Sequence, residues 1–265
     1  MRVAVFLACL SLALARRLPG SHERIVGGSN APAGSRPYQV TVLYSSSPTD
    51  FYCSGTLVHP KWVVTAGNCF DDVGDVYVGL GYTDLTSSTG GTHVIKGTWH
   101  LCPAFDYQTL DGDLALIELD AEVPLSSTIQ TIKIAASGSD VSAGTQVLVS
   151  GWGSTSADGS ATYQLQQVVL EILDRDKCDA RYTWEDITSN MLCTESNQGK
   201  DTCWSDEGGP LVIKYSESSH STSTTLAGVV SWGWECGDHD YPAMYNRVTN
   251  FCSWIESTTG QDICL

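Results

Sequence analysis

Short runs of apolar and β-branched residues, separated by turn residues, recur along the chain from residue 25 onward. Clear examples are 39–44, 62–65 and 146–149, with clusters of Gly, Ser, Asp and Asn between such runs. They predict β-strands, because β-branched side chains suit a pleated and half-buried surface. Strands at this spacing, without a sustained helical period, favour an all-β sandwich or a pair of β-barrels.

A helical pattern occurs near the C-terminal end, over residues 248–258. Gly260 follows and is suited to end a helix. The apolar residues that share one face of this predicted helix are Val248, Phe251, Cys252 and Ile255. We therefore predict one C-terminal helix after the strands.

The first residues of the chain differ from the rest. Arg2 precedes an apolar run from Val3 to Ala15 that ends in alternating small residues, the pattern of a secretory signal peptide. A bilayer span needs about 20 apolar residues, more than this run has. We predict a signal peptide over residues 1–15, a secreted, extracellular protein and no membrane partner; a buried N-terminal helix is the alternative.

Composition and charge narrow the function classes. The chain has 265 residues, 42% of them hydrophobic, which is enough for a substantial core. Its 30 acidic and 14 basic residues give a net charge of -16, so no nucleic acid is expected as a partner. A charge of this size also serves solubility alone. Ten cysteines indicate an oxidising compartment.

Six short motifs follow one another along the chain: RIVGG at 24–28, TAGNC at 65–69, DLAL at 113–116, GWG at 151–153, DEGGPL at 206–211 and SWG at 231–233. Together they resemble the chymotrypsin-like (S1, trypsin-type) serine proteases over residues 25 to about 259. The resemblance implies an all-β fold of two six-stranded β-barrels of the trypsin type with a C-terminal helix and a cleft between the barrels. It also implies a propeptide over 16–24 and a trypsin-like domain over 25–265.

The resemblance implies three disulfides, each worth roughly 2–4 kcal/mol. The implied pairs are Cys53 with Cys69, Cys178 with Cys193, and Cys203 with Cys236. Outside this set and the signal peptide lie Cys102, Cys252 and Cys264. If two of these pair, we expect Cys102 to bond to a cysteine of the C-terminal segment, which leaves the third free or bridging to another molecule.

The catalytic positions depart from the family pattern. Hydrolysis by this architecture needs a hydroxyl nucleophile, an imidazole base, an orienting carboxylate and backbone donors for the oxyanion. Asp113 matches the carboxylate, but Asn68 stands at the position of the imidazole and Glu207 at that of the nucleophile. An amide does not accept a proton near neutral pH, and a carboxylate does not perform the acyl-enzyme chemistry. Ser205 replaces a glycine of the oxyanion hole, which we interpret as damage to that hole.

Two other chemistries are weighed against this interpretation. In the first, Glu207 and Asp113 form a carboxylate pair that shares a proton. The alternative is that Glu207 hydrogen-bonds to Asn68 or is solvated. A relocated histidine base is the other, although the mature chain's histidines are expected away from the catalytic positions: His59, His93, His100, His220 and His239. No metal site is expected, because no His or Cys outside the disulfide set has ligand spacing, and no cofactor is implied.

The specificity pocket is partly retained. Asp201 matches the carboxylate that attracts Lys or Arg in trypsin-like proteases, with Ser231 and Gly233 on one wall. Ala243 stands where the family has glycine and narrows the opposite wall. A basic protein or peptide ligand is therefore expected, and a solvated Asp201 without a ligand is the alternative. Trp204 and Trp232 offer aromatic surface for contact with a ligand. The alternative is that they pack within the protein, and we favour this alternative for Trp232.

The activation residues are present. Arg24-Ile25 resembles the family's zymogen cleavage site, so an activating protease is an expected partner. The new ammonium group at Ile25 is expected to pair with Asp206, because a buried charge is costly without a partner. The alternative is a chain that is never processed.

These observations predict a secreted trypsin-like serine protease homologue that is catalytically inactive. It is expected to act by binding, as a decoy, an inhibitor or a protease cofactor. The alternative is a trypsin-like serine endopeptidase that cleaves after Arg or Lys, and a third interpretation is a decayed paralogue without function.

Overall fold

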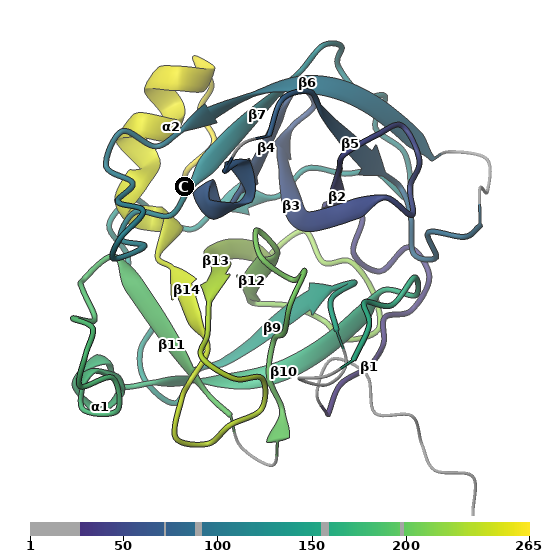
Figure 1. The fold of residues 1–265 in the computed structure, drawn as a ribbon. Helices are drawn as coiled ribbons and strands as arrows, with labels where there is room; N and C mark the ends of the chain where they lie inside the picture. The colour runs from purple at the N-terminus through teal and green to yellow at the C-terminus, as the bar shows by residue number, and fades with distance from the viewer. Residues whose placement is uncertain (1–26, 72, 88–91, 155–158, 197–198) are drawn as a thin grey trace, which may run out of the picture.

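The computed structural model describes residues 27–265, except residue 72 and the segments 88–91, 155–158 and 197–198 (Figure 1). The predicted signal peptide, the propeptide and the Arg24-Ile25 pair lie outside the described residues. The described chain forms two antiparallel β-barrels with a helix at the C-terminal end, so the predicted fold class is confirmed.

The N-terminal barrel is closed in the strand order β2-β3-β4-β7-β6-β5. Its strands are β2 (Gln39–Leu43), β3 (Phe51–His59), β4 (Trp62–Thr65), β5 (Val76–Leu80), β6 (His93–Leu101) and β7 (Ala115–Leu119). The apolar runs at 39–44 and 62–65 therefore become β2 and β4. All five residues of β2 are buried, and so are all four of β4.

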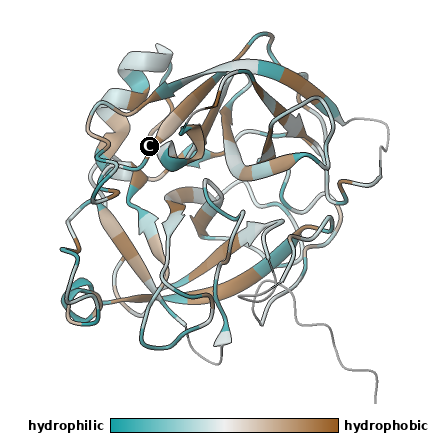
Figure 2. Ribbon diagram, in the orientation of Figure 1, coloured by the Kyte–Doolittle hydropathy of each residue, from teal (hydrophilic) through white to brown (hydrophobic). Residues whose placement is uncertain are grey.

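The C-terminal barrel is closed by β9-β10-β11-β14-β13-β12, with β12 pairing back to β9. Its strands are β9 (Gln146–Gly151), β10 (Gln166–Leu173), β11 (Met191–Glu195), β12 (Pro210–Ile213), β13 (Thr225–Trp232) and β14 (Met244–Asn246). Two short strands extend it: β1 (Ser29–Asn30) pairs with β10, and β8 (Lys133–Ile134) runs parallel to β13. Figure 2 shows hydrophobic segments on the strands of both barrels.

Short helical elements occupy the connections and the end of the chain. A 3-10 turn, η1 (Gly67–Phe70), follows β4, and a second, η3 (Val248–Phe251), leads directly into α2 (Cys252–Thr259). Gly260 ends α2 with a φ of 67°, as its lack of a Cβ allows, so the predicted helix and its stop are confirmed. A five-residue helix, α1 (Arg175–Asp179), was not predicted, because it is too short to show a period. Among the described helices, none is long and apolar enough to cross a membrane.

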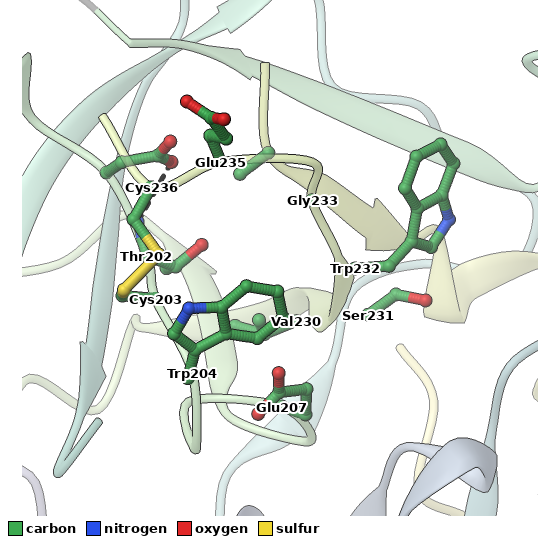
Figure 3. A pocket seen from close by; sticks show the side chains of 12 residues that line it. Thr202, Cys203, Trp204, Glu207, Val230, Ser231, Trp232, Gly233, Glu235 and Cys236 are labelled. Carbon is green, nitrogen blue, oxygen red and sulfur yellow. Dashed lines mark hydrogen bonds between the residues drawn. A yellow bond between two sulfur atoms is a disulfide. The ribbon is translucent and has the colours of Figure 1, made fainter. Parts of the chain in front are cut away.

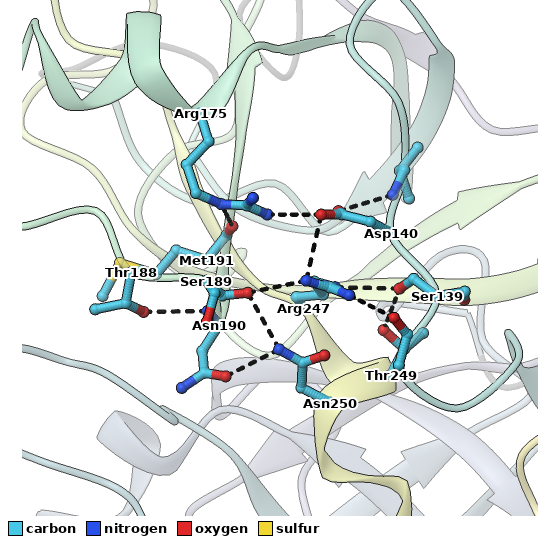
Figure 4. A network of polar contacts seen from close by, with 12 residues as sticks. Ser139, Asp140, Arg175, Thr188, Ser189, Asn190, Met191, Arg247, Thr249 and Asn250 are labelled. Atoms are coloured by element: carbon cyan, nitrogen blue, oxygen red, sulfur yellow. Dashed lines mark hydrogen bonds and ion pairs between the residues drawn. The ribbon is translucent and has the colours of Figure 1, made fainter.

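A polar network around Arg247 joins segments that are distant in sequence (Figure 4). Arg247 pairs with Asp140 at 3.2 Å and donates to the carbonyl oxygens of Ser139 and Ser189. Asp140 also forms an ion pair with Arg175 at the start of α1. The network therefore ties β14 and η3 to α1 and to the loop before β9.

The three disulfides implied by the resemblance are present: Cys53–Cys69, Cys178–Cys193 and Cys203–Cys236. The expected pairing of Cys102 is wrong, because Cys252 bonds to Cys264 and Cys102 remains a free, buried thiol. The left-handed turn at Gly260 sends the chain back along α2, where the Cys264 amide donates to the Glu256 carboxylate at 3.1 Å. Cys264 therefore returns to the start of its own helix.

Replacing both Cys252 and Cys264 with serine should lower the free energy of unfolding by about 3 kcal/mol, because the bridge restricts a short loop in the unfolded chain. Denaturant titration of parent and variant measures this loss. Peptide mapping of the intact, non-reduced protein should show Cys102 alkylated only after unfolding. A bridge that contains Cys102 would contradict the assignment.

Candidate functional site

A pocket opens on the C-terminal barrel beside the junction of the two barrels. The empty volume of this pocket, including the part that is open to solvent, is about 330 Å³. Figure 3 shows Glu207 and Glu235 on opposite sides of it, with Trp204 between. The other lining residues that the argument below uses are Asp201, Ser231, Trp232, Gly233 and Ala243. The structure thus gathers residues from the loop before β12, the end of β13 and the loop before β14.

The loop from Cys203 to Pro210 carries Glu207 and is pressed against the N-terminal barrel. The Ser54 amide on β3 donates to the Glu207 carbonyl oxygen at 2.8 Å. Gly208 has a φ of 80°, and a Cβ there would lie 2.2 Å from the Ser54 carbonyl oxygen. Only glycine allows this approach, so the GGP sequence positions Glu207 at the junction.

Asp113 is fully buried just before β7. Its carboxylate accepts hydrogen bonds from the Asn68 amide N–H at 2.6 Å and from the Ser231 hydroxyl at 2.5 Å. Burial raises the pKa of Asp113 to about 6, and these donors offset part of the rise. The carboxylate is therefore held by neutral donors from both barrels.

Asn68 lies on η1, beside Asp113 in space. Its side-chain amide donates to the Ser231 carbonyl oxygen at 3.0 Å, across the junction of the barrels. The amide group therefore ties η1 to the end of β13. The sequence left open a bond between Glu207 and Asn68, and the structure instead gives the Asn68 amide this backbone partner.

Glu207 turns its carboxylate back onto its own loop. The backbone amides of Glu207 and Ser205 lie near that carboxylate and lower its pKa. Burial raises the pKa of Glu207 to about 7; these two amides lower it and the nearby Asp113 carboxylate raises it further. The carboxylate therefore lies beside backbone amides of its own loop.

Ser205 adopts a backbone conformation that glycine would reach more easily. Its φ is 72°, in the left-handed region, which costs a residue with a Cβ about 1–2 kcal/mol. The Cys203–Cys236 bridge and the bonds of Asp206 hold the loop nonetheless. The turn is thus kept, and the Ser205 amide is directed at the Glu207 carboxylate.

Asp206 is fully buried behind the loop. It accepts hydrogen bonds from the Gly153 amide at 2.8 Å and the Cys203 amide at 3.0 Å. A Cβ at Gly153 would lie within 2.7 Å of the carboxylate, so this contact requires glycine. Burial raises the pKa of Asp206 to about 7, with Glu207 and Asp201 raising it further. Its predicted partner Ile25 lies outside the described residues.

Asp201 forms the base of the pocket. It accepts hydrogen bonds from the Gly237 amide at 2.9 Å and the Ser196 hydroxyl at 3.0 Å. Burial raises the pKa of Asp201 to about 7. Sequence reasoning missed Ser196 and also Glu235 at the rim, because loop residues of this kind carry no periodic signal.

Gly233 and Ala243 both line the pocket. A Cβ built at Gly233 would lie 3.9 Å from the Ala243 Cα, so these two residues lie side by side at the ends of β13 and β14. Trp204 is 51% exposed and is free to contact a ligand. Trp232 packs edge-on against Tyr182 with ring centres 5.1 Å apart, which supports the packing interpretation for this residue.

The histidines of the described chain lie elsewhere. His59 ends β3, His93 starts β6, and His100 on β6 approaches Glu118. His220 packs near Tyr38, and His239 is exposed beside Asp240. Among the described residues, no group of three or more His, Cys, Asp or Glu is arranged to hold a metal ion.

Four carboxylates with raised pKa values therefore converge on this site: Asp113, Asp201, Asp206 and Glu207. Their hydrogen-bond donors are backbone amides and hydroxyls, and none of the ion pairs within the described ranges involves them. The site thus holds four carboxyl groups that are not paired with a basic side chain among the described residues.

Two closed barrels and a polar site at their junction define a protein of the trypsin fold class. The family profile "Trypsin" matches residues 25–255, and the chain belongs to the trypsin-like (S1) serine protease family. Similar relatives include Trypsin Blo t 3 of Blomia tropicalis, 33% identical over 97% of this chain and 98% of the relative. Cationic trypsin-3 of Rattus norvegicus is 34% identical over 98% of this chain and 99% of the relative. Trypsin of Sus scrofa is 34% identical over 89% of this chain and 96% of the relative.

The uncleaved protein should become more stable as the pH falls from 8 towards 5. A carboxyl group whose pKa is raised on folding binds its proton more tightly in the folded state. The stability it contributes is complete below the unfolded pKa near 4 and is lost as the pH rises through the folded values of about 6 to 7. Thermal unfolding across this range measures the slope.

Glu207→Gln should make that slope shallower, because it removes one of the four titrating groups. Glu171→Gln, on an exposed position of β10, is the matched control and should leave the slope unchanged. A parent protein whose stability rises with pH over this range would contradict the assignment.

Proposed function

We propose that this chain is a secreted, trypsin-like serine protease homologue that does not hydrolyse peptide bonds and that acts by binding a basic protein or peptide segment in its cleft. The signal-peptide pattern of residues 1–15 supports secretion, and four disulfides are consistent with an extracellular protein.

The place of Glu207 at the family's nucleophile position, on a loop that the Ser54 amide and Gly208 hold against the N-terminal barrel, carries this proposal. Its carboxylate lies beside the backbone amides of Ser205 and Glu207. By resemblance, these are the amides that stabilise the oxyanion of the transition state in the family. A carboxylate that fills the same place removes the donors and adds a negative charge where another develops, which opposes the reaction. Glu207 thus removes both the hydroxyl nucleophile and access to the oxyanion hole.

Asn68 removes the base. Its position is that of the family's histidine, and its amide nitrogen is committed to the Ser231 carbonyl oxygen. Asp113, which in the family orients that histidine, accepts hydrogen bonds here from the Ser231 hydroxyl and from the backbone N–H of Asn68. Loss of the nucleophile or the base costs on the order of 10⁶ in turnover.

The charge of the site supports a basic ligand. Asp201 at the base, Glu207 beside the mouth and Glu235 at the rim all line the pocket. A guanidinium or ammonium group from a partner would neutralise buried negative charge that the described chain leaves without an ion pair. The proposed roles are those of a decoy, an inhibitor or a cofactor of an active protease, reached after cleavage at Arg24 by an activating protease.

The second candidate is a trypsin-like serine endopeptidase. The names of the relatives favour it, because the proteins that match this chain over most of its length are called trypsins. Fold alone does not decide between the two, because catalysis depends on the site residues.

The purified chain, cleaved after Arg24 and verified by N-terminal sequencing at Ile25, should not hydrolyse Arg, Lys or aromatic amide substrates. Introducing Asn68→His together with Glu207→Ser should produce cleavage after Arg or Lys, because it supplies base and nucleophile and empties the oxyanion hole. Adding Ser205→Gly and Ala243→Gly should raise this activity further. Steady-state kinetics with and without a serine protease inhibitor measure the gain.

Asn68→His alone is the matched control and should remain inactive, since Glu207 still fills the oxyanion hole. Inhibitor-sensitive turnover by the unmodified chain would overturn the proposed function and establish the endopeptidase.

A further inference from the structure

The loop between β2 and β3 carries a run of hydroxyl residues around one proline. Residues 44–50 read YSSSPTD, and Asp50 is the only charged residue among them. Ser46, Ser47 and Thr49 are exposed. Serine and threonine grouped with proline are typical of segments that carry O-linked sugars. The 44–50 loop therefore has the composition of a glycan acceptor.

The 44–50 loop is held at its base. The Tyr44 N–H donates to the Asp50 carbonyl oxygen at 3.0 Å, and the Tyr44 ring stacks on Tyr52 with ring centres 4.1 Å apart. At the tip, the Asp50 N–H donates to the Ser47 carbonyl oxygen at 3.0 Å, which closes a turn around Pro48. The tip therefore stands on a fixed base.

Two hydroxyl groups flank the proline. The side-chain oxygens of Ser47 and Thr49 lie 3.1 Å apart, and both residues are exposed. Pro48 fixes its own φ and favours an extended backbone at the residue before it. An enzyme that modifies a side chain must reach its oxygen atom directly, and exposed positions at the tip of a loop allow this.

A second hydroxyl-rich loop, between β12 and β13, differs in two respects. Residues 216–223 read SESSHSTS, which contains no proline and places Glu217 among the hydroxyl groups. The buried Arg36 donates to the carbonyl oxygens of Glu217 at 3.0 Å and Ser219 at 3.4 Å. This loop is therefore tied down along its middle, so the proline and the open tip favour the 44–50 loop as the acceptor.

N-linked glycosylation has no acceptor in this sequence. No asparagine is followed two residues later by serine or threonine. Any sugar that the chain carries after passing through the secretory pathway is consequently O-linked, and its position can be read without interference from N-linked glycans.

We propose that Thr49 and Ser47 accept an O-linked N-acetylhexosamine during secretion. The hydroxyl oxygen attacks the anomeric carbon of a nucleoside-diphosphate sugar, and a C–O bond forms. The nucleoside diphosphate leaves with the electron pair of the bond that breaks, and the hydroxyl proton passes to a base of the transferase. A bulky, polar group at this tip would also cover the ring of Tyr44, which is 57% exposed. The proposal rests on the proposed secretion and is independent of the proposed loss of catalysis.

The test expresses the full chain from residue 1 in cultured animal cells and maps the secreted protein by mass spectrometry, with fragmentation that keeps sugars on their side chains. The peptide that contains residues 44–50 should carry N-acetylhexosamine on Thr49 or Ser47, and the peptide that contains residues 216–223 should carry none. Ser47→Ala combined with Thr49→Ala should abolish the sugar. Pro48→Ala should reduce the modified fraction several-fold, because the acceptor loses its extended backbone.

Ser218→Ala combined with Thr222→Ala is the matched control. It removes two exposed hydroxyl groups from the other loop and should leave the modified fraction unchanged. A secreted protein with unmodified residues 44–50 overturns the acceptor assignment and leaves the proposed secretion standing. Phosphate in place of the sugar, or sugar only on residues 216–223, also overturns it. A chain retained in the cell with residues 1–15 attached overturns the proposed secretion and the acceptor assignment together.

Discussion

The site depends on one tight contact between the barrels, where the loop from Cys203 to Pro210 meets β3 and β4. Gly208 places its backbone so close to the Ser54 carbonyl oxygen that no side chain fits there. The buried Asp206 fills the space behind the loop and is bonded by backbone amides. Because the backbone is held on both sides, the residue at position 207 is directed into the junction whatever its identity. A glutamate at this place consequently reaches the amides of its own loop.

The same rigid backbone also holds several carboxylates in buried positions. Each carboxylate of the site occupies a buried position whose donors are neutral, so each pays a desolvation cost that only partial hydrogen bonding offsets. Native proteins retain such groups where they serve binding or catalysis. Attraction of an external cation to these carboxylates is the property that the proposed function uses.

One disulfide differs from the expected pairing because of a local turn of the chain. The sequence resemblance predicted the three family-type bridges, and all three are present. The pairing of Cys252 with Cys264 was not predicted, because it follows from the reversal of the chain at Gly260, a backbone conformation that pattern analysis does not resolve. Cys102 stays unpaired in the core of the N-terminal barrel, next to β7, with no second cysteine beside it in the described residues.

The sequence by itself determined the two-barrel class, most strand positions, the C-terminal helix and the identity of the residues at the catalytic positions, because apolar periodicity and short ordered motifs are local properties. Only the tertiary structure decided the partners of those residues. It placed the Asn68 side-chain amide on the Ser231 carbonyl oxygen, the Glu207 backbone against Ser54, and Ser196 beside Asp201. It also brought the rings of Trp184 and Trp234, which lie far apart in the chain, within 5.6 Å of each other. These contacts are long-range or depend on exact backbone direction, and both arise only when the barrels close and pack together.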